Sequence, residues 1–118
     1  MDDPSPVSEA GAAELLAELV SYDSRNPPGR EAACARFVAD WLADAGVDAE
    51  LVREPYPDRS QVVATVGGGD PEAGHLVLNG HVDVVPPGDR ERWSVDPFEG
   101  VVDADAGRVY GRGASDMK

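Results

Sequence analysis

The chain has 118 residues, of which 42% are hydrophobic, and this is enough for one domain with an apolar core. Its formal net charge of −13 argues against nucleic acid as a partner, because phosphates require basic patches on the protein. A lone cysteine excludes an intrachain disulfide and fits a reducing compartment. The chain contains no secretory segment and no apolar run of about 18 residues, so we expect a cytoplasmic protein that does not span a membrane.

The acidity itself has two explanations. Many carboxylates on a short chain repel one another in dilute buffer and are screened in high salt, which favours a salt-adapted, halophilic source. Alternatively, the Arg-rich and Ala-rich composition reflects a GC-rich genome. The composition alone leaves both explanations open.

The first part of the chain predicts two helices. Ser8 can cap a helix that extends to about Tyr22, since its leucines recur at helical spacing. The Asn26-Pro27-Pro28-Gly29 loop ends this helix. A second helix is expected over residues 30–45, and Gly46 suits the position just after its C-terminus.

Short strands are predicted next. They cover residues 48–53, 61–66 and 75–79 and are separated by Pro-rich and Gly-rich turns. A hairpin is expected to join 100–103 to 108–110. The apolar run within 75–79 resembles a buried parallel strand, and open α/β sheets bind ligands at the carboxyl ends of such strands.

His81 and Asp83 follow that apolar run. Two residues apart in an extended segment, their side chains project to the same face. A neutral imidazole binds zinc through one nitrogen and donates its other N–H to a carboxylate, so we interpret His81 as a ligand and Asp83 as its orienting group. The alternative is a histidine at a strand end beside a turn-forming aspartate.

A second motif lies at residues 111–118. Gly111 and Gly113 allow the backbone to approach closely just before Asp116, whose two carboxylate oxygens could bridge a pair of metal ions. The alternative is a surface loop of turn-favouring residues.

Taken together, four segments resemble the metallohydrolase family of acetylornithine deacetylase, succinyl-diaminopimelate desuccinylase, aminoacylase and carboxypeptidase G. Residues 80–86 match its G-H-x-D-V-V-P signature, and residues 111–118 match G-R-G-x-x-D-M-K. Trp93 with residues 96–98 resembles its W-x-x-x-P-F segment, and residues 24–29 resemble its S-x-N-P-P-G loop.

The resemblance implies an α/β fold, namely the N-terminal part of a zinc-exopeptidase-like catalytic domain with a mixed sheet flanked by helices. It implies that residues 8–118 form this part and that residues 1–7 are a disordered N-terminus. His81 would be the ligand of one metal, Asp116 would bridge both, and Asp83 would be the catalytic residue that orients His81. It further implies two Zn²⁺ ions, or Co²⁺, in the full-length enzyme and a cis peptide between Asp116 and Met117.

The implied function is hydrolysis of an amide bond in N-acyl amino acids or small peptides, by an enzyme that is a homodimer when full length. The family's Glu-Glu pair, which includes the general base, and its later ligands do not occur in residues 1–118, so this chain is expected to be an inactive fragment on its own. Two alternatives remain: a truncated, non-catalytic binding or regulatory module, and a related zinc aminopeptidase.

Overall fold

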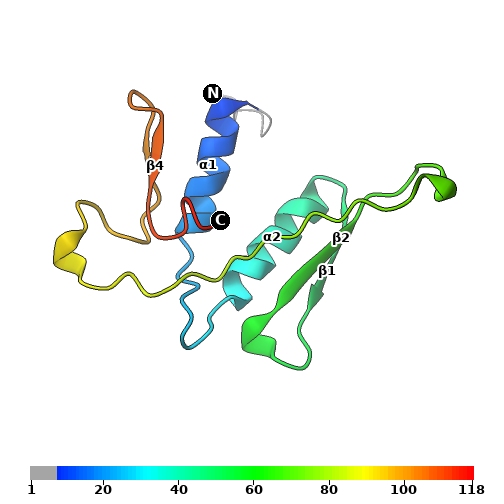
Figure 1. Cartoon of the computed structure of the whole chain (residues 1–118), viewed down its shortest axis with the longest axis horizontal. Helices are drawn as coiled ribbons and strands as arrows, with labels where there is room; N and C mark the ends of the chain where they lie inside the picture. Colours follow the sequence, from blue (N-terminus) through cyan, green and yellow to red (C-terminus); the bar gives the residue numbers. More distant parts are fainter. Residues whose placement is uncertain (1–7) are drawn as a thin grey trace.

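The computed structural model describes residues 8–118, which form two helices and two hairpins. Figure 1 shows two groups of elements: one helix stands beside the C-terminal hairpin, and the other covers the central hairpin. The α/β class predicted from the sequence agrees with this arrangement, whereas the predicted disorder of residues 1–7 lies outside the described residues. The helices and strands are α1 (Glu9–Val20), α2 (Ala32–Asp44), β1 (Asp48–Val52), β2 (Gln61–Thr65), β3 (Val101–Asp103) and β4 (Arg108–Tyr110).

Helix α1 begins where the sequence predicts and ends slightly earlier. The Ser8 hydroxyl accepts a hydrogen bond from the Gly11 amide at 3.0 Å, which satisfies one of the unpaired donors of the first turn. The helix contacts both β3 and β4. A Cβ at Gly100 would lie 2.2 Å from the Ala17 carbonyl oxygen, so a glycine is required where the hairpin approaches the helix.

Helix α2 packs on the β1–β2 hairpin. Its buried side includes Cys34, Ala35 and Ala39, which confirms that the single cysteine is a core residue. Gly46 follows the helix with φ of +82°, as expected for a glycine that ends a helix in the left-handed region. The antiparallel register runs from Asp48↔Thr65 to Val52↔Gln61.

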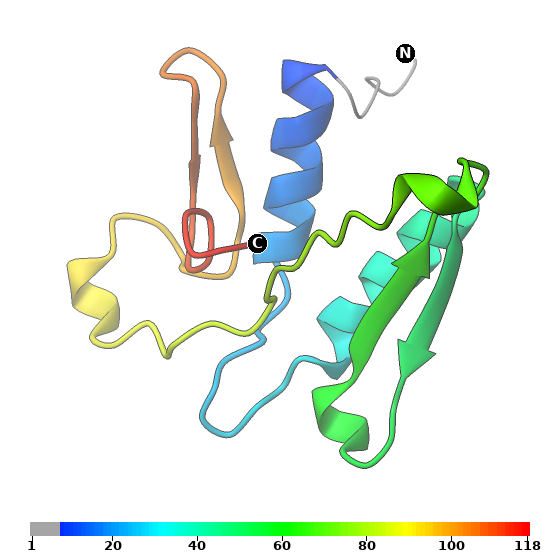
Figure 2. The ribbon, with the colours of Figure 1, turned by 45° about the vertical axis from the view of Figure 1, so that its right-hand side comes forward.

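The predicted strand at residues 75–79 is wrong. These residues have no strand assignment, and Leu76, Val77 and Leu78 are 79–88% exposed. Figure 2 shows this segment, coloured yellow-green, leading from the β1–β2 group towards α1. No strand of residues 8–118 lies beside it to accept its backbone hydrogen bonds, so apolar character alone does not make it part of a sheet.

The mixed sheet predicted with that strand is not found in the part of the chain that is described. The strands form two separate antiparallel pairs, β1–β2 and β3–β4. Parallel pairing among these residues is limited to a single bridge between Arg25 and Val84. No helix within residues 8–118 is both long enough and apolar enough to cross a membrane.

Candidate metal centre

The segment that leaves α1 holds the backbone next to His81. The Asn26 amide donates to the Val84 carbonyl at 2.7 Å, and the Val84 amide donates to the Ser24 carbonyl at 3.1 Å. The Ser24 hydroxyl donates to the Val82 carbonyl. Ser24 is fully buried and Val84 is 3% exposed, so these bonds are anchored at two buried residues. The first motif is therefore attached to the exit of α1.

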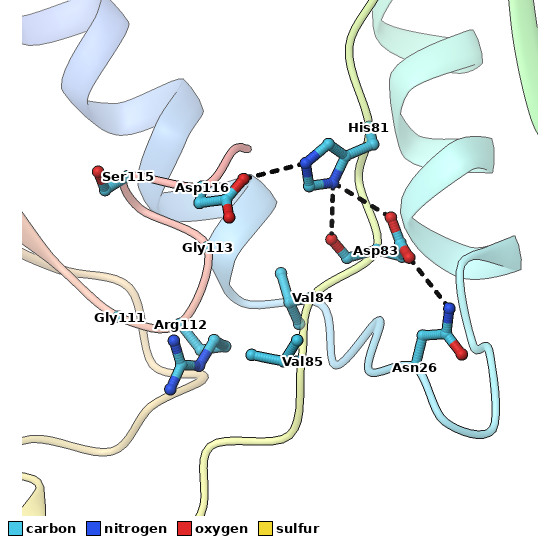
Figure 3. Close-up of a pocket in the computed structure, with 10 residues that line it drawn as sticks. All are labelled: Asn26, His81, Asp83, Val84, Val85, Gly111, Arg112, Gly113, Ser115 and Asp116. Atoms are coloured by element: carbon cyan, nitrogen blue, oxygen red, sulfur yellow. Dashed lines mark hydrogen bonds and ion pairs between the residues drawn. The ribbon is translucent and has the colours of Figure 1, made fainter.

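The same segment orients the histidine ring. Nδ1 of His81 lies 3.0 Å from the backbone carbonyl oxygen of Asp83 and 3.1 Å from the side-chain Oδ1 of the same residue. The Asn26 side-chain amide donates to Oδ2 of Asp83 at 3.2 Å. With Nδ1 occupied by Asp83, Nε2 of His81 faces Oδ1 of Asp116 at 3.0 Å, as Figure 3 shows.

The surroundings of His81 favour its protonated form when no metal is present. The hydrogen bond to the Asp83 carbonyl raises the pKa of His81 above its ordinary value, desolvation opposes this, and the Asp116 carboxylate raises it further. A proton and a metal ion would compete for Nε2 of His81, because a ligating histidine must be neutral at that nitrogen.

Asp116 is carried by a loop whose first residues pack against α1. A Cβ added to Gly111 would lie 2.3 Å from Cγ1 of Val20 and 3.1 Å from the Pro97 carbonyl oxygen. The Arg112 amide donates to that same carbonyl at 2.7 Å. The glycine at position 111 is therefore required by close contact with α1.

The end of the loop is attached to the exit of α1 as well. The Lys118 amide donates to the Gly113 carbonyl at 2.7 Å, and the Lys118 ammonium donates to the carbonyl of Tyr22. Burial lowers the pKa of Lys118. The cis peptide predicted between Asp116 and Met117 is confirmed. Both motifs thus reach the same short segment after α1, from opposite sides of the site.

Between the motifs lies a cleft of about 270 Å³. Figure 3 shows its polar side, where His81 and Asp116 point towards each other, and the apolar side chains of Val84 and Val85. The lining residues are Asn26, His81, Asp83, Val84, Val85, Gly111, Arg112, Gly113, Ser115 and Asp116.

The donors in this cleft fit part of a metal site. An imidazole nitrogen and a carboxylate oxygen are both zinc donors, and the Asp116 side chain is 88% exposed, so its second oxygen is accessible. Zinc sites take three or four protein ligands. Among residues 8–118, however, no group of three His, Cys, Asp or Glu side chains converges suitably for a metal ion. The described residues therefore supply two donors.

Structure and sequence agree on which predicted residues meet. His81, Asp83 and Asp116 lie together. Sequence reasoning gave no structural role to Ser24 or Lys118. Two features of the sequence could have indicated these roles: the polar Ser24 lies in the loop after a helix, and Lys118 is the single lysine of a very acidic chain.

Comparisons with known proteins agree with the motifs. Residues 77–118 match the model of peptidase family M20/M25/M40, a region that includes both signatures. The chain is 39% identical over 117 residues to a succinyl-diaminopimelate desuccinylase of Parvibaculum lavamentivorans, covering 97% of this chain and 28% of that protein. Proteins of the same name from Xylella fastidiosa and Methylobacterium nodulans are 44% and 45% identical, over 89% and 98% of this chain and 26% of each relative.

These matches confirm the resemblance to peptidase family M20/M25/M40 that the motifs predict. The chain spans about a quarter of the length of the curated relatives that it matches.

Proposed function

We propose that the protein of which this chain is part is a metal-dependent hydrolase of amide bonds in N-acyl amino acids or small peptides. The facing pair of His81 Nε2 and Asp116 Oδ1, 3.0 Å apart at the edge of a cleft in a chain that matches this family, carries the proposal. The relatives are named succinyl-diaminopimelate desuccinylases, so a succinylated diamino acid is the first substrate to test. We further propose that the full-length enzyme is a cytoplasmic homodimer.

Each residue of the site has a separate part in this proposal. His81 would hold a zinc or cobalt ion through Nε2, and Asp116 would use both carboxylate oxygens for two ions. When bound, such ions would lower the pKa of a water towards about 7 and would polarise the carbonyl group of a substrate. Asp83 would accept a hydrogen bond from the Nδ1–H group of His81 and so leave Nε2 of the neutral ring as the nitrogen that holds an ion.

The 118-residue chain alone is proposed to be inactive. Its described residues bring one imidazole and one carboxylate face to face, fewer donors than a zinc site requires. The nearest further carboxylate, Asp83, is engaged by His81 and Asn26 and is not free to act as a general base.

The test uses the product of the full reading frame, loaded with zinc or cobalt. We expect two metal ions per chain and hydrolysis of a succinylated diamino acid, with N-acetylornithine as the comparison substrate. His81→Ala should lower kcat/KM by more than about 100-fold, since loss of a residue that merely supports a ligand already costs about 10–100-fold.

The matched control is His75→Ala, which removes the other histidine of the chain, an exposed residue outside the cleft. It should retain full activity and metal content. A full-length product that binds no metal, or a His81→Ala variant as active as the parent, would contradict the proposed function.

A further inference from the structure

Asp116 is placed by its backbone and not by packing of its side chain. That side chain is 88% exposed, and its one described partner is Nε2 of His81. The backbone that carries it is fixed two residues later, where the Lys118 amide donates to the Gly113 carbonyl at 2.7 Å. Whatever holds Lys118 therefore also holds the carboxylate in front of His81.

The side chain of Lys118 is held at two points. Its stem lies against Gly113, where an added Cβ would be 3.0 Å from Cδ and 3.2 Å from Cγ of the lysine. Its ammonium donates to the Tyr22 carbonyl, just beyond the end of α1. The Lys118 side chain therefore connects the loop that carries Asp116 to the exit of α1 and contacts Gly113 on the way.

The electrostatics at the end of α1 favour a cation there. The last carbonyls of a helix carry partial negative charge and are stabilised by a positive group. Helix α1 has no basic residue in its own last turn. The ammonium of Lys118 supplies that charge from a distant part of the sequence. Its hydrogen bond to the Tyr22 carbonyl is therefore reinforced by electrostatic attraction.

From these contacts we propose that Lys118 is a positioning residue: by tying the 111–118 loop to the Tyr22 carbonyl, it holds the Asp116 carboxylate against His81. The inference rests on the proposed function insofar as this pair binds metal. It predicts that loss of the ammonium, with the apolar stem retained, loosens the loop and weakens the metal site.

The test compares variants of the full-reading-frame product by titration with zinc against a competing chelator. Lys118→Met keeps an unbranched stem and removes the ammonium, and it should weaken zinc binding by about 10–100-fold. Lys118→Arg, which restores the positive charge, should recover part of the loss. Arg53→Met removes one charge from an exposed position far along the chain and should bind zinc as the parent does.

Two further measurements test whether weaker zinc binding results from displacement of Asp116. The visible absorption of the cobalt-loaded protein should change in Lys118→Met, because the geometry around the ion changes with Asp116. Hydrogen exchange without metal should accelerate at the amides of residues 113–118, and not in α2. If Lys118→Met fails to fold, Lys118→Gln replaces it and is judged by the same measurements.

The possible outcomes separate the two proposals. A parent protein that binds zinc, with a Lys118→Met variant that has the same affinity, spectrum and exchange rates, would overturn the role of Lys118 and leave the proposed function intact. If the parent binds no zinc, the proposed function fails. In that case, unchanged hydrogen exchange at residues 113–118 in the Lys118→Met variant would overturn the positioning role as well. Faster exchange at these residues would support the role of Lys118 in holding the loop.

Discussion

Residues 76–78 and 82–84 are two short, largely apolar stretches of one extended segment, and they have opposite fates. The first is almost fully exposed, whereas the second is bonded to Ser24 and Asn26, with Val84 buried. Both have the composition of a strand. The difference is a neighbour: the exit of α1 offers backbone donors and acceptors to the second stretch, and the described residues offer none to the first. Burial of an apolar segment thus depends on whether a neighbouring segment can form backbone hydrogen bonds with it.

The comparison predicts that substitutions around Val84 and the loop that contacts it destabilise the fold, while similar substitutions in exposed segments do not. The largest effect is expected for Gly111→Ala, because the new methyl group would overlap Val20 and the Pro97 carbonyl. We expect a loss of about 3 kcal/mol in the free energy of unfolding, measured with urea. Gly69→Ala, whose methyl group would enter open space, is the control and should be nearly neutral.

Val84→Ala should have the next largest effect. Removing its buried methyl groups should cost about 2 kcal/mol in the free energy of unfolding. The same change at Val77, in the exposed stretch, should cost less than about 0.5 kcal/mol. Equal losses at the two positions, by urea unfolding followed through tryptophan fluorescence, would mean that the two stretches are equally buried and would break the comparison.

Ser24→Ala tests the side-chain bond between the helix exit and the second stretch. It removes the buried hydroxyl that donates to the Val82 carbonyl and should cost about 1–2 kcal/mol, since that carbonyl loses a partner. Ser21→Ala removes an exposed hydroxyl that bonds only within its own turn, and its effect should stay within about 0.5 kcal/mol. A Ser24→Ala variant as stable as the Ser21→Ala variant would show that backbone pairing alone holds the stretch.

The smallest effect concerns protonation of His81 in the metal-free protein. Because its pKa is raised in the folded state, the protonated ring stabilises the fold fully below about pH 6.5, and this contribution disappears as the pH rises through the raised pKa. Asp116→Asn removes one cause of the shift and should move the pKa of His81 down towards its ordinary value, as followed by NMR of the ring protons.

Asp105→Asn, which changes an exposed carboxylate in the turn of the C-terminal hairpin, is the control for that titration. It should leave the pKa of His81 where it is. If Asp116→Asn leaves it there too, the contact between the ring and Asp116 does not persist in solution.

Much of the local structure was predictable because the signals are local. The Ser8 cap, the glycine after α2, the strands β1 and β2 and the C-terminal hairpin follow from neighbouring residues alone. The meeting of His81 with Asp116 was predictable from a family resemblance that joins distant motifs. The strand at 75–79 could not be judged in this way, because pairing depends on residues elsewhere in the chain. The roles of Ser24 and Lys118 likewise depend on long-range contacts that no local pattern encodes.

Because both motifs are attached directly to the exit of α1, the polypeptide between them can change without moving the site. A Cβ at Gly113 would lie 2.8 Å from Cγ1 of Val84, so the chain leaves the site near Val84 and returns to it at the same place. The length of the intervening excursion does not set the distance between His81 and Asp116. The exposed turn at residues 104–107, at the tip of the β3–β4 hairpin, is accordingly a suitable place to insert an epitope or a fluorescent domain without disturbing the cleft.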